Sequence, residues 1–252
     1  KDSESHSTHV SGIIAGDRQN KSGNKGINNL AEIMVLRAVP NGDEYDKDVA
    51  LAIRYAVDNG AKIINGSFGK YFSSNPEWVI DAIKYASDND VLFIAGAGND
   101  SKDLDPISND NYPNDQFLNK DEFSDTFIKV GASGINLNEN FTAYFSNYGK
   151  INVDIFAPGV DIYSSMPNNK YKSQDGTSMS SPVVAGVASL IMSYFPKLSA
   201  KKVKEINLES GIEIDLKIGK LGNNKHFREY SKSGKLINAY NALILASNSK
   251  RK

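Results

Sequence analysis

The stretch DGTSMSSPVVAGVASL, from Asp175 to Leu190, places a serine hydroxyl at the start of an almost wholly apolar segment that ends before Pro196. A helix that is apolar on every side is buried between the layers of a protein. Its first turn presents unpaired N–H groups and the positive end of the helix dipole, and both favour developing negative charge. Ser178 therefore occupies a position that suits a nucleophile as well as a simple helix cap.

Strand and helix patterns alternate in the part of the chain that precedes this segment. The alternation predicts parallel strands joined by crossover helices, which is typical of an α/β fold. We expect strands over residues 33–38, 62–68, 91–95, 127–130 and 153–156. We expect helices over residues 6–15, 46–59, 75–86, 200–207 and 237–246, besides the one at Ser178. Polar surface loops are predicted over residues 17–26 and 98–124.

The composition narrows the class of protein. The chain has 252 residues, which suits one large domain with a sizeable core, and its 29 basic and 30 acidic side chains give a net charge of −1. This balance gives no reason to expect binding to nucleic acid or to an anionic membrane. No apolar run is long enough to span a membrane, and the lack of cysteine excludes disulfides and thiol chemistry.

A nucleophilic serine needs a base, and the sequence contains three histidines, His6, His9 and His226. His226 lies in the polar stretch NNKHFREY and is predicted to be a solvated surface residue. His6 and His9 are three positions apart, so on a helix both line one face, one as the base and the other as a structural residue. Metal binding is the alternative that this spacing raises, but no HExxH pattern and no nearby acidic partner supports it.

The segment FIAGAGND places Asn99 directly after a predicted buried strand. Its amide suits donation to an oxyanion, although asparagine is also common in tight turns. Gly96 and Gly98 match the first two glycines of a dinucleotide-binding pattern, but position 101 is serine and a polar loop follows instead of a helix. The sequence therefore does not support a dinucleotide-binding site here. The order of His before Ser, the serine at position 180 and the α/β pattern exclude the nucleophile-elbow and chymotrypsin classes. The remaining class of serine hydrolases has its catalytic residues in the order Asp, His, Ser along the chain.

Further motifs accompany these residues, in a fixed order that spans His6 to Leu198. Through HSTHVSGIIAG and DGTSMSSP the chain resembles the subtilisin-like serine peptidases, whose His and Ser motifs are similar. INGSFG looks like the substrate-pairing strand of that family and AGAGND like its oxyanion motif, while FSNYG, IFAPGVDIYS and SGKLINAYNAL also fit. Matches this numerous, in this order, are highly specific.

The resemblance implies a three-layer subtilisin-like α/β fold, with a mainly parallel central sheet and helices on both faces. It implies a serine endopeptidase that forms an acyl-enzyme through an Asp–His–Ser triad and binds its peptide substrate extended. By position, Ser178 matches the nucleophile, His6 the general base and Asn99 the oxyanion donor. The residues that match the substrate-pairing edges and pocket walls are Ser67, Phe68, Gly69, Ala97, Gly98, Asn41, Gly42 and Asp43.

The chain departs from the family pattern before the His motif. The Asp motif of the family precedes that His on a strand, whereas only five residues precede His6 here, and Asp2 lacks the matching context. We therefore expect residues 1–252 to be a peptidase domain that lacks the Asp-motif segment. Ser7 and Ser180 also replace the usual Gly and Ala. A catalytically inactive, peptide-binding relative is the alternative that these departures leave open.

The resemblance also carries expectations about cofactors, partners and location. No cofactor is required, but the loop 17–23 stands where many family members bind a structural calcium, with Asp17 and Asn20 as candidate ligands. A plain solvated turn is the alternative for this loop. The implied partner is a protein or peptide substrate, with no nucleic acid. The implied state is a monomer that is secreted or held at the cell envelope.

Overall fold

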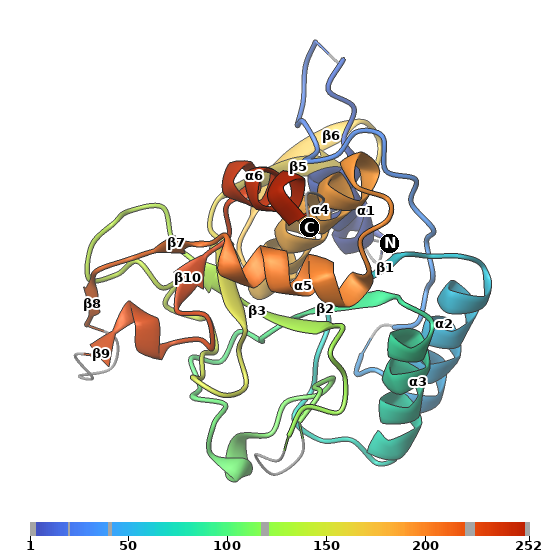
Figure 1. The fold of residues 1–252 in the computed structure, drawn as a ribbon, viewed down its shortest axis with the longest axis horizontal. Coiled ribbons are helices and arrows are strands. Elements are labelled where there is room, and N and C mark those ends of the chain that lie inside the picture. Colours follow the sequence, from blue (N-terminus) through green and yellow to red (C-terminus); the bar gives the residue numbers. More distant parts are fainter. Residues whose placement is uncertain (1–3, 20, 40–41, 117–120, 220–224, 250–252) are drawn as a thin grey trace.

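The computed structural model describes residues 4–19, 21–39, 42–116, 121–219 and 225–249. A six-stranded sheet in the order β1-β2-β3-β4-β10-β7 forms its centre (Figure 1). Every neighbouring pair in this sheet is parallel except β10 and β7, as the alternation of strands and helices predicted. The strands are β1 (Ile63–Gly66), β2 (Leu92–Gly96), β3 (Phe127–Ser133), β4 (Ile155–Pro158), β10 (Lys235–Leu236) and β7 (Ile212–Glu213).

Helices cover both faces of this sheet, so the predicted three-layer fold is confirmed (Figure 1). Strand β2 shows how the layers divide, because successive side chains of a strand point to opposite faces. Phe93 joins the core under α2 and α3, whereas Leu92 and Ile94 join the core under α4, α5 and α6. These helices are α2 (Asp46–Asp58), α3 (Pro76–Asp88), α4 (Thr177–Tyr194), α5 (Ala200–Glu209) and α6 (Ala239–Ser249).

Helix α4 lies at the centre of its layer. It is buried along most of its length and contacts strands β1 to β4 as well as α5, α6 and α1 (Ser5–Ala15). Gly186 makes one close approach possible, because a Cβ at this position would lie 2.8 Å from the Cβ of Ile27. The predicted buried helix is therefore present, and its first turn contains Ser178.

The predicted strand at residues 33–38 is absent, so this prediction is wrong. Ile33, Met34 and Val35 are 41%, 43% and 68% exposed, and the stretch has no regular secondary structure. A buried strand needs a neighbour that satisfies its backbone N–H and C=O groups. In the part of the chain that the structure describes, β1 pairs with β2 alone and its other edge is open. Apolar composition predicted burial here, but composition does not reveal whether a pairing strand is present.

A two-stranded hairpin of β5 (Ile162–Met166) and β6 (Lys170–Gln174) was not predicted. Its turn contains Asn168 and Asn169 with φ of 63° and 55°, a left-handed conformation that asparagine tolerates well. The hairpin packs on α1 and leads directly to Gly176, so it links α1 to the start of α4. Further short elements are β8 (Lys217–Ile218), β9 (Lys225–His226) and the 3₁₀ helices Ile107–Asn109 and Phe227–Glu229.

Candidate active site

Ser178 lies in the first turn of α4, at the edge of the sheet where the parallel strands end. Gly176 comes just before the helix with φ of 147°, a conformation that side-chain-bearing residues rarely adopt. The backbone N–H of Ser178 has no intrahelical acceptor, because it belongs to the first turn. Its Oγ donates to the carbonyl oxygen of Ser67 at 3.2 Å, so the hydroxyl points toward the chain that continues β1.

The Asn99 side chain is held by the same turn of α4. Its Oδ1 accepts from the N–H of Thr177 at 2.9 Å and from the Thr177 hydroxyl at 3.1 Å. These bonds leave Nδ2 as a donor for another group. A Cβ built on Gly176 would lie 3.6 Å from both Asn99 Nδ2 and the backbone nitrogen of Ser178. The two donors therefore border one point in space, an arrangement that can stabilise an oxyanion.

The two histidines of α1 lie in different environments. His6 is exposed, whereas His9 is completely buried. The Nε2 of His9 lies 2.9 Å from the carbonyl oxygen of Lys172, to which it donates, and the His9 carbonyl accepts from the Ser164 hydroxyl at 2.7 Å. These bonds fasten α1 to the β5–β6 hairpin. They give His9 a structural role and leave the His6 ring available at the surface.

Within the described residues, no hydrogen bond joins His6 to Ser178 and no carboxylate pairs with His6. Partial desolvation lowers the pKa of His6, and the neighbouring His9 lowers it further. Burial also lowers the pKa of His9, against the opposing effect of its backbone hydrogen bonds. Both imidazoles are therefore neutral at neutral pH, the form in which histidine accepts a proton. Asp2 lies outside the described residues.

A cavity of about 260 Å³ opens beside Ser178. The residues around it come from the ends of β1 and β2, the start of α4 and the long loop after β2. The site residues predicted from the sequence that line this cavity are Ser67, Phe68, Gly69, Gly98, Asn99 and Ser178. Residues that line it without having been predicted are Tyr71, Gly96, Asp100, Asn111 and Thr177.

Ala97 is fully buried behind the cavity wall, where its carbonyl accepts from Asn147 Nδ2 at 2.8 Å. The same Asn147 amide donates to the Tyr71 hydroxyl at 2.7 Å, and its Oδ1 accepts from the N–H of Asp100 at 3.1 Å. The Tyr71 hydroxyl in turn donates to the Asp100 carboxylate at 2.6 Å. Burial, together with this carboxylate, raises the pKa of Tyr71, so the hydroxyl keeps its proton. The motif FSNYG, which contains Asn147, was the sequence signal for this network.

The opposite substrate edge is only partly described. Asn41 lies outside the described residues, and Gly42 and Asp43 are exposed and do not line the cavity. The next residue, Glu44, does reach the predicted substrate strand, because its Oε1 accepts from the N–H of Gly69 at 3.0 Å. The chain that follows Asp43 therefore lies beside Gly69. The Glu44 carboxylate accepts from the backbone N–H of Gly69, which would otherwise be free to pair with a substrate.

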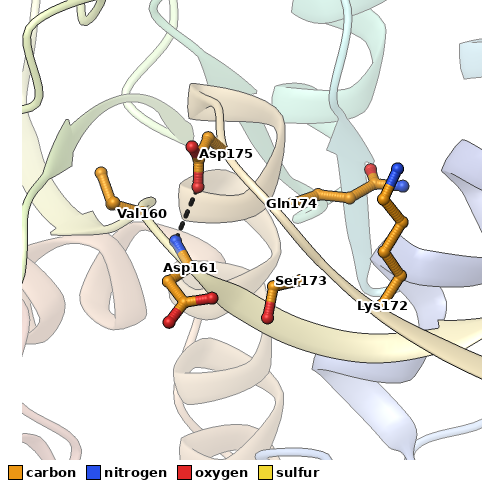
Figure 2. A pocket seen from close by; sticks show the side chains of 6 residues that line it. All are labelled: Val160, Asp161, Lys172, Ser173, Gln174 and Asp175. Atoms are coloured by element: carbon orange, nitrogen blue, oxygen red, sulfur yellow. Dashed lines mark hydrogen bonds between the residues drawn. The ribbon is translucent and has the colours of Figure 1, made fainter.

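A second, open hollow lies along the end of the β5–β6 hairpin (Figure 2). The Oδ1 of Asp175 accepts from the N–H of Asp161 at 2.7 Å. Figure 2 shows this bond where β6 runs into α4. It ties the start of the hairpin to the approach to Ser178. The residues that line the hollow are Val160, Asp161, Lys172, Ser173, Gln174 and Asp175.

The candidate calcium loop offers few ligands. Asp17 is exposed, and its Oδ1 accepts from the N–H of Gln19 at 2.8 Å, as in a local Asx turn. Asn20 lies outside the described residues. No group of three or more His, Cys, Asp or Glu side chains is gathered as a metal site in the described ranges. The calcium site stays a prediction.

Comparison with known proteins gives concordant matches. The family model described as Peptidase_S8, subtilase family, matches residues 1–231. The thermophilic serine proteinase of Bacillus sp. (strain AK1) is 34% identical over 96% of this chain and 53% of its own length. The cell wall-associated protease of Bacillus subtilis (strain 168) is 34% identical over 91% of this chain and 24% of its own. This chain thus spans about half or less of these two relatives.

Solved structures agree with the sequence matches. The prenylagaramide maturation protease PagA has a TM-score of 0.74 and 28% identity, with 95% of this chain and 82% of that chain covered. None of the helices in the described ranges is both long and apolar enough to cross a membrane.

His6 and His9 are expected to reduce the stability of the folded chain as the pH falls below the ordinary pKa of histidine. His6 and His9 have lowered pKa values in the folded state, so the unfolded chain binds more protons in this range. These two groups make the free energy of unfolding rise with pH between about pH 5 and about pH 7, whereas the buried Asp115 carboxyl, whose pKa is raised to about 7, acts in the opposite direction. The contribution of the histidines is therefore the difference in slope between the parent and a histidine variant. Thermal unfolding across this range measures the slope.

The matched variant is His9→Asn, which keeps a polar side chain but removes one of the two titrating groups. We expect it to have a smaller slope than the parent. An equal or steeper slope would contradict the assignment of the pH dependence to this pair.

Proposed function

Because this chain belongs to the subtilase family, we propose that it is the catalytic domain of a serine endopeptidase that cleaves peptide bonds through an acyl-enzyme at Ser178. One observation carries the proposal. The Ser178 hydroxyl lies at the mouth of a cavity, in the first turn of a buried helix, with its backbone N–H beside the Asn99 amide. This arrangement supports a nucleophile and an oxyanion site within one helical turn.

The proposed reaction assigns one step to each residue. Ser178 Oγ attacks the carbonyl carbon of the substrate while His6 takes its proton. The carbonyl oxygen becomes an oxyanion, which accepts from the Ser178 N–H and from Asn99 Nδ2. His6 then gives the proton to the leaving amine, and water hydrolyses the acyl-enzyme by the reverse use of the same groups. In subtilisin, a member of this family, the loss of one oxyanion donor costs about 10²–10³-fold in kcat.

The test is covalent labelling with a fluorophosphonate probe. Ser178→Ala is expected to abolish labelling, because the probe reacts only with an activated serine. Ser180→Ala is the matched control: Ser180 is in the same helical turn, fully buried, and should leave labelling intact. Labelling that survives in Ser178→Ala would overturn the assignment. A complete protein that binds peptide but is never labelled would favour the inactive, peptide-binding alternative.

We propose that the carboxylate that orients His6 is supplied by polypeptide upstream of Lys1. Three observations support this. No carboxylate among the described residues pairs with His6, the outer edge of β1 is unpaired within the described chain, and the apolar residues Ile33, Met34 and Val35 are exposed. An upstream strand with an Asp would supply both the carboxylate and a partner for β1. In subtilisin itself, loss of that Asp costs about 3 × 10⁴ in kcat, or about 6 kcal/mol of barrier.

Supplying the upstream segment, in cis or co-expressed, is therefore expected to raise cleavage of a chromogenic peptide by about 10⁴-fold. The same addition should raise the pKa of His6, because a carboxylate stabilises the imidazolium. Histidine NMR follows that pKa independently of turnover. Full activity of the 252-residue chain alone, with no effect of Asp2→Ala, would show that another group orients His6.

For the substrate, we propose an extended protein or peptide with a large apolar side chain before the cleaved bond. Phe68 and the glycines around the cavity favour such a side chain. The Asp100 carboxylate also lines the cavity, but it already accepts from the Tyr71 hydroxyl. A peptide-library profile is expected to favour large apolar residues at this position. A strict preference for basic residues would mean that Asp100 binds the substrate instead.

We propose a secreted or envelope location and a monomeric state on the family resemblance alone. One relative is named as cell wall-associated, which supports the proposed location. No cofactor enters the proposed reaction, since every step uses side chains and backbone groups of the peptidase.

A further inference from the structure

Lys129 lies in the middle of β3, a strand that is buried along its whole length. Its side chain is only 2% exposed. The Nζ donates to the carbonyl oxygens of Asn111 at 2.9 Å and Pro113 at 2.7 Å. Burying an ammonium is costly, and lysine is almost never fully buried without partners. These two carbonyls belong to the long loop after β2, so the ammonium joins this loop to the sheet.

Acidic side chains further from the ammonium offset part of that cost through their charge. The Asp154 carboxylate accepts from the backbone N–H of Lys129 at 2.6 Å. Burial lowers the pKa of Lys129 to about 7, while Asp115, Asp154 and Asp110 act in the opposite direction. Burial also raises the pKa of Asp115 to about 7, because its carboxylate is likewise desolvated.

Two more lysines from other elements, the buried Lys204 and the partly buried Lys232, extend this charge network. Lys204 of α5 donates to Glu122 at 2.8 Å and lies 3.8 Å from Asp115. Lys232 pairs with Glu122 and lies 3.6 Å from Asp154. Neither of these ammonium groups is hydrogen-bonded to the carbonyls of Asn111 or Pro113. Within the described residues, Lys129 therefore makes the direct connection from this network to that part of the loop.

The loop segment 111–113 also forms part of the proposed substrate cavity. Asn111 lines the cavity. Tyr112 pairs with Lys70 through both backbone groups: its N–H donates to the Lys70 carbonyl at 2.8 Å, and its carbonyl accepts from the Lys70 N–H at 3.0 Å. A Cβ on Gly69 would lie 3.0 Å from the Tyr112 carbonyl oxygen, so the two chains are in close contact. Alternate residues of the segment thus face Lys129 on one side and the substrate strand on the other.

We propose that Lys129 is a positioning residue for the substrate cavity: its buried ammonium holds segment 111–113 against the strand at Gly69 and Lys70, and so fixes the cavity wall that Asn111 provides. The inference rests on the proposed function, because it assumes that this cavity receives the substrate side chain. Lys129 touches no substrate. It acts through the two carbonyls that it binds, and its loss should weaken substrate binding rather than the chemical step.

The first test compares Lys129→Met with Lys204→Met. Both variants remove a buried ammonium from the same network, but Lys129 binds the carbonyls of segment 111–113 directly, whereas Lys204 pairs with carboxylates further along the same loop. Hydrogen exchange of the Tyr112 and Lys70 amides reports on the segment without any need for catalysis. We expect exchange about 10–100-fold faster in Lys129→Met, in line with the loss of hydrogen bonds to a charged group, and little change in Lys204→Met. Equal protection in Lys129→Met and the parent would overturn the inference.

The second test measures the binding of a peptide with a large apolar side chain before the scissile bond, in a Ser178→Ala background that prevents turnover. Lys129→Met is expected to weaken the affinity by about tenfold or more, and Lys204→Met to leave it unchanged. If the parent binds the peptide and Lys129→Met binds it equally well, the inference fails. If the parent binds no peptide although Lys129→Met frees the segment, the proposed function fails instead.

Chemical rescue keeps the inference testable if Lys129→Met does not fold. Lys129→Ala removes three methylene groups and the ammonium, which together match n-propylammonium. This cation is expected to restore amide protection and peptide affinity to Lys129→Ala, whereas 1-propanol, with the same length but no charge, should not. Rescue by both compounds alike, or by neither in a folded variant, would show that an ammonium is not what holds the segment.

Discussion

The hydrogen bonds from Thr177 to the Asn99 Oδ1 join the end of β2 to the first turn of α4, and the arrangement of the site depends on this junction. The buried helix and the sheet each hold one donor, the Ser178 N–H and the Asn99 Nδ2. One helical turn is about 5.4 Å, so a slip of α4 by a single turn would remove Ser178 from the cavity. The apolar contacts of α4 with four strands oppose such a slip. The same apolar contacts that pack α4 in the core therefore also fix the position of Ser178 in the site.

The cavity walls depend on hydrogen bonds from buried polar side chains, because much of these walls is formed by loops. Asn147 holds one wall through the Ala97 carbonyl and the Tyr71 hydroxyl. Lys129 holds the segment that carries Asn111. Loops bury few apolar side chains of their own, so buried polar groups that bind their backbone take the place of a hydrophobic core. Each such group is costly to bury and is retained only where its partners are complete.

The fold could be predicted from the sequence wherever local pattern and burial agree. The helix at Asp46–Asp58 and the strand at Leu92–Gly96 appear close to their expected bounds, because their apolar spacing matches the faces that they bury. The prediction of a strand over residues 33–38 was wrong, because this stretch has no pairing strand within the described chain. The β5–β6 hairpin was missed, although its Asn168-Asn169 turn was a usable signal.

The site was predictable to the extent that its residues lie in short motifs. Ser178, Asn99 and Ser67–Gly69 follow strands or begin a helix, and the fold brings them to one cavity. Asn111 and Lys129 carried no such signal. A lysine inside an apolar strand gives no indication of which distant carbonyls it binds, and a long polar loop does not indicate which of its residues returns to the cavity. Long-range contacts of single polar side chains have no sequence period, so they emerge only from the fold.

The site has two parts, which differ in the hydrogen bonds that hold them in place. The two proposed oxyanion donors are held by Thr177 and Gly176, both within the described chain. The helix that carries His6 is anchored by His9, but the His6 ring itself has no carboxylate partner among the described residues. In subtilisin, an oxyanion site with substrate binding alone retains about 10³–10⁴-fold catalysis over water. If Asn99 and His6 act as proposed, the donors of the oxyanion site are in place before the base is oriented, and the domain would bind and polarise a carbonyl before its proton transfer is efficient.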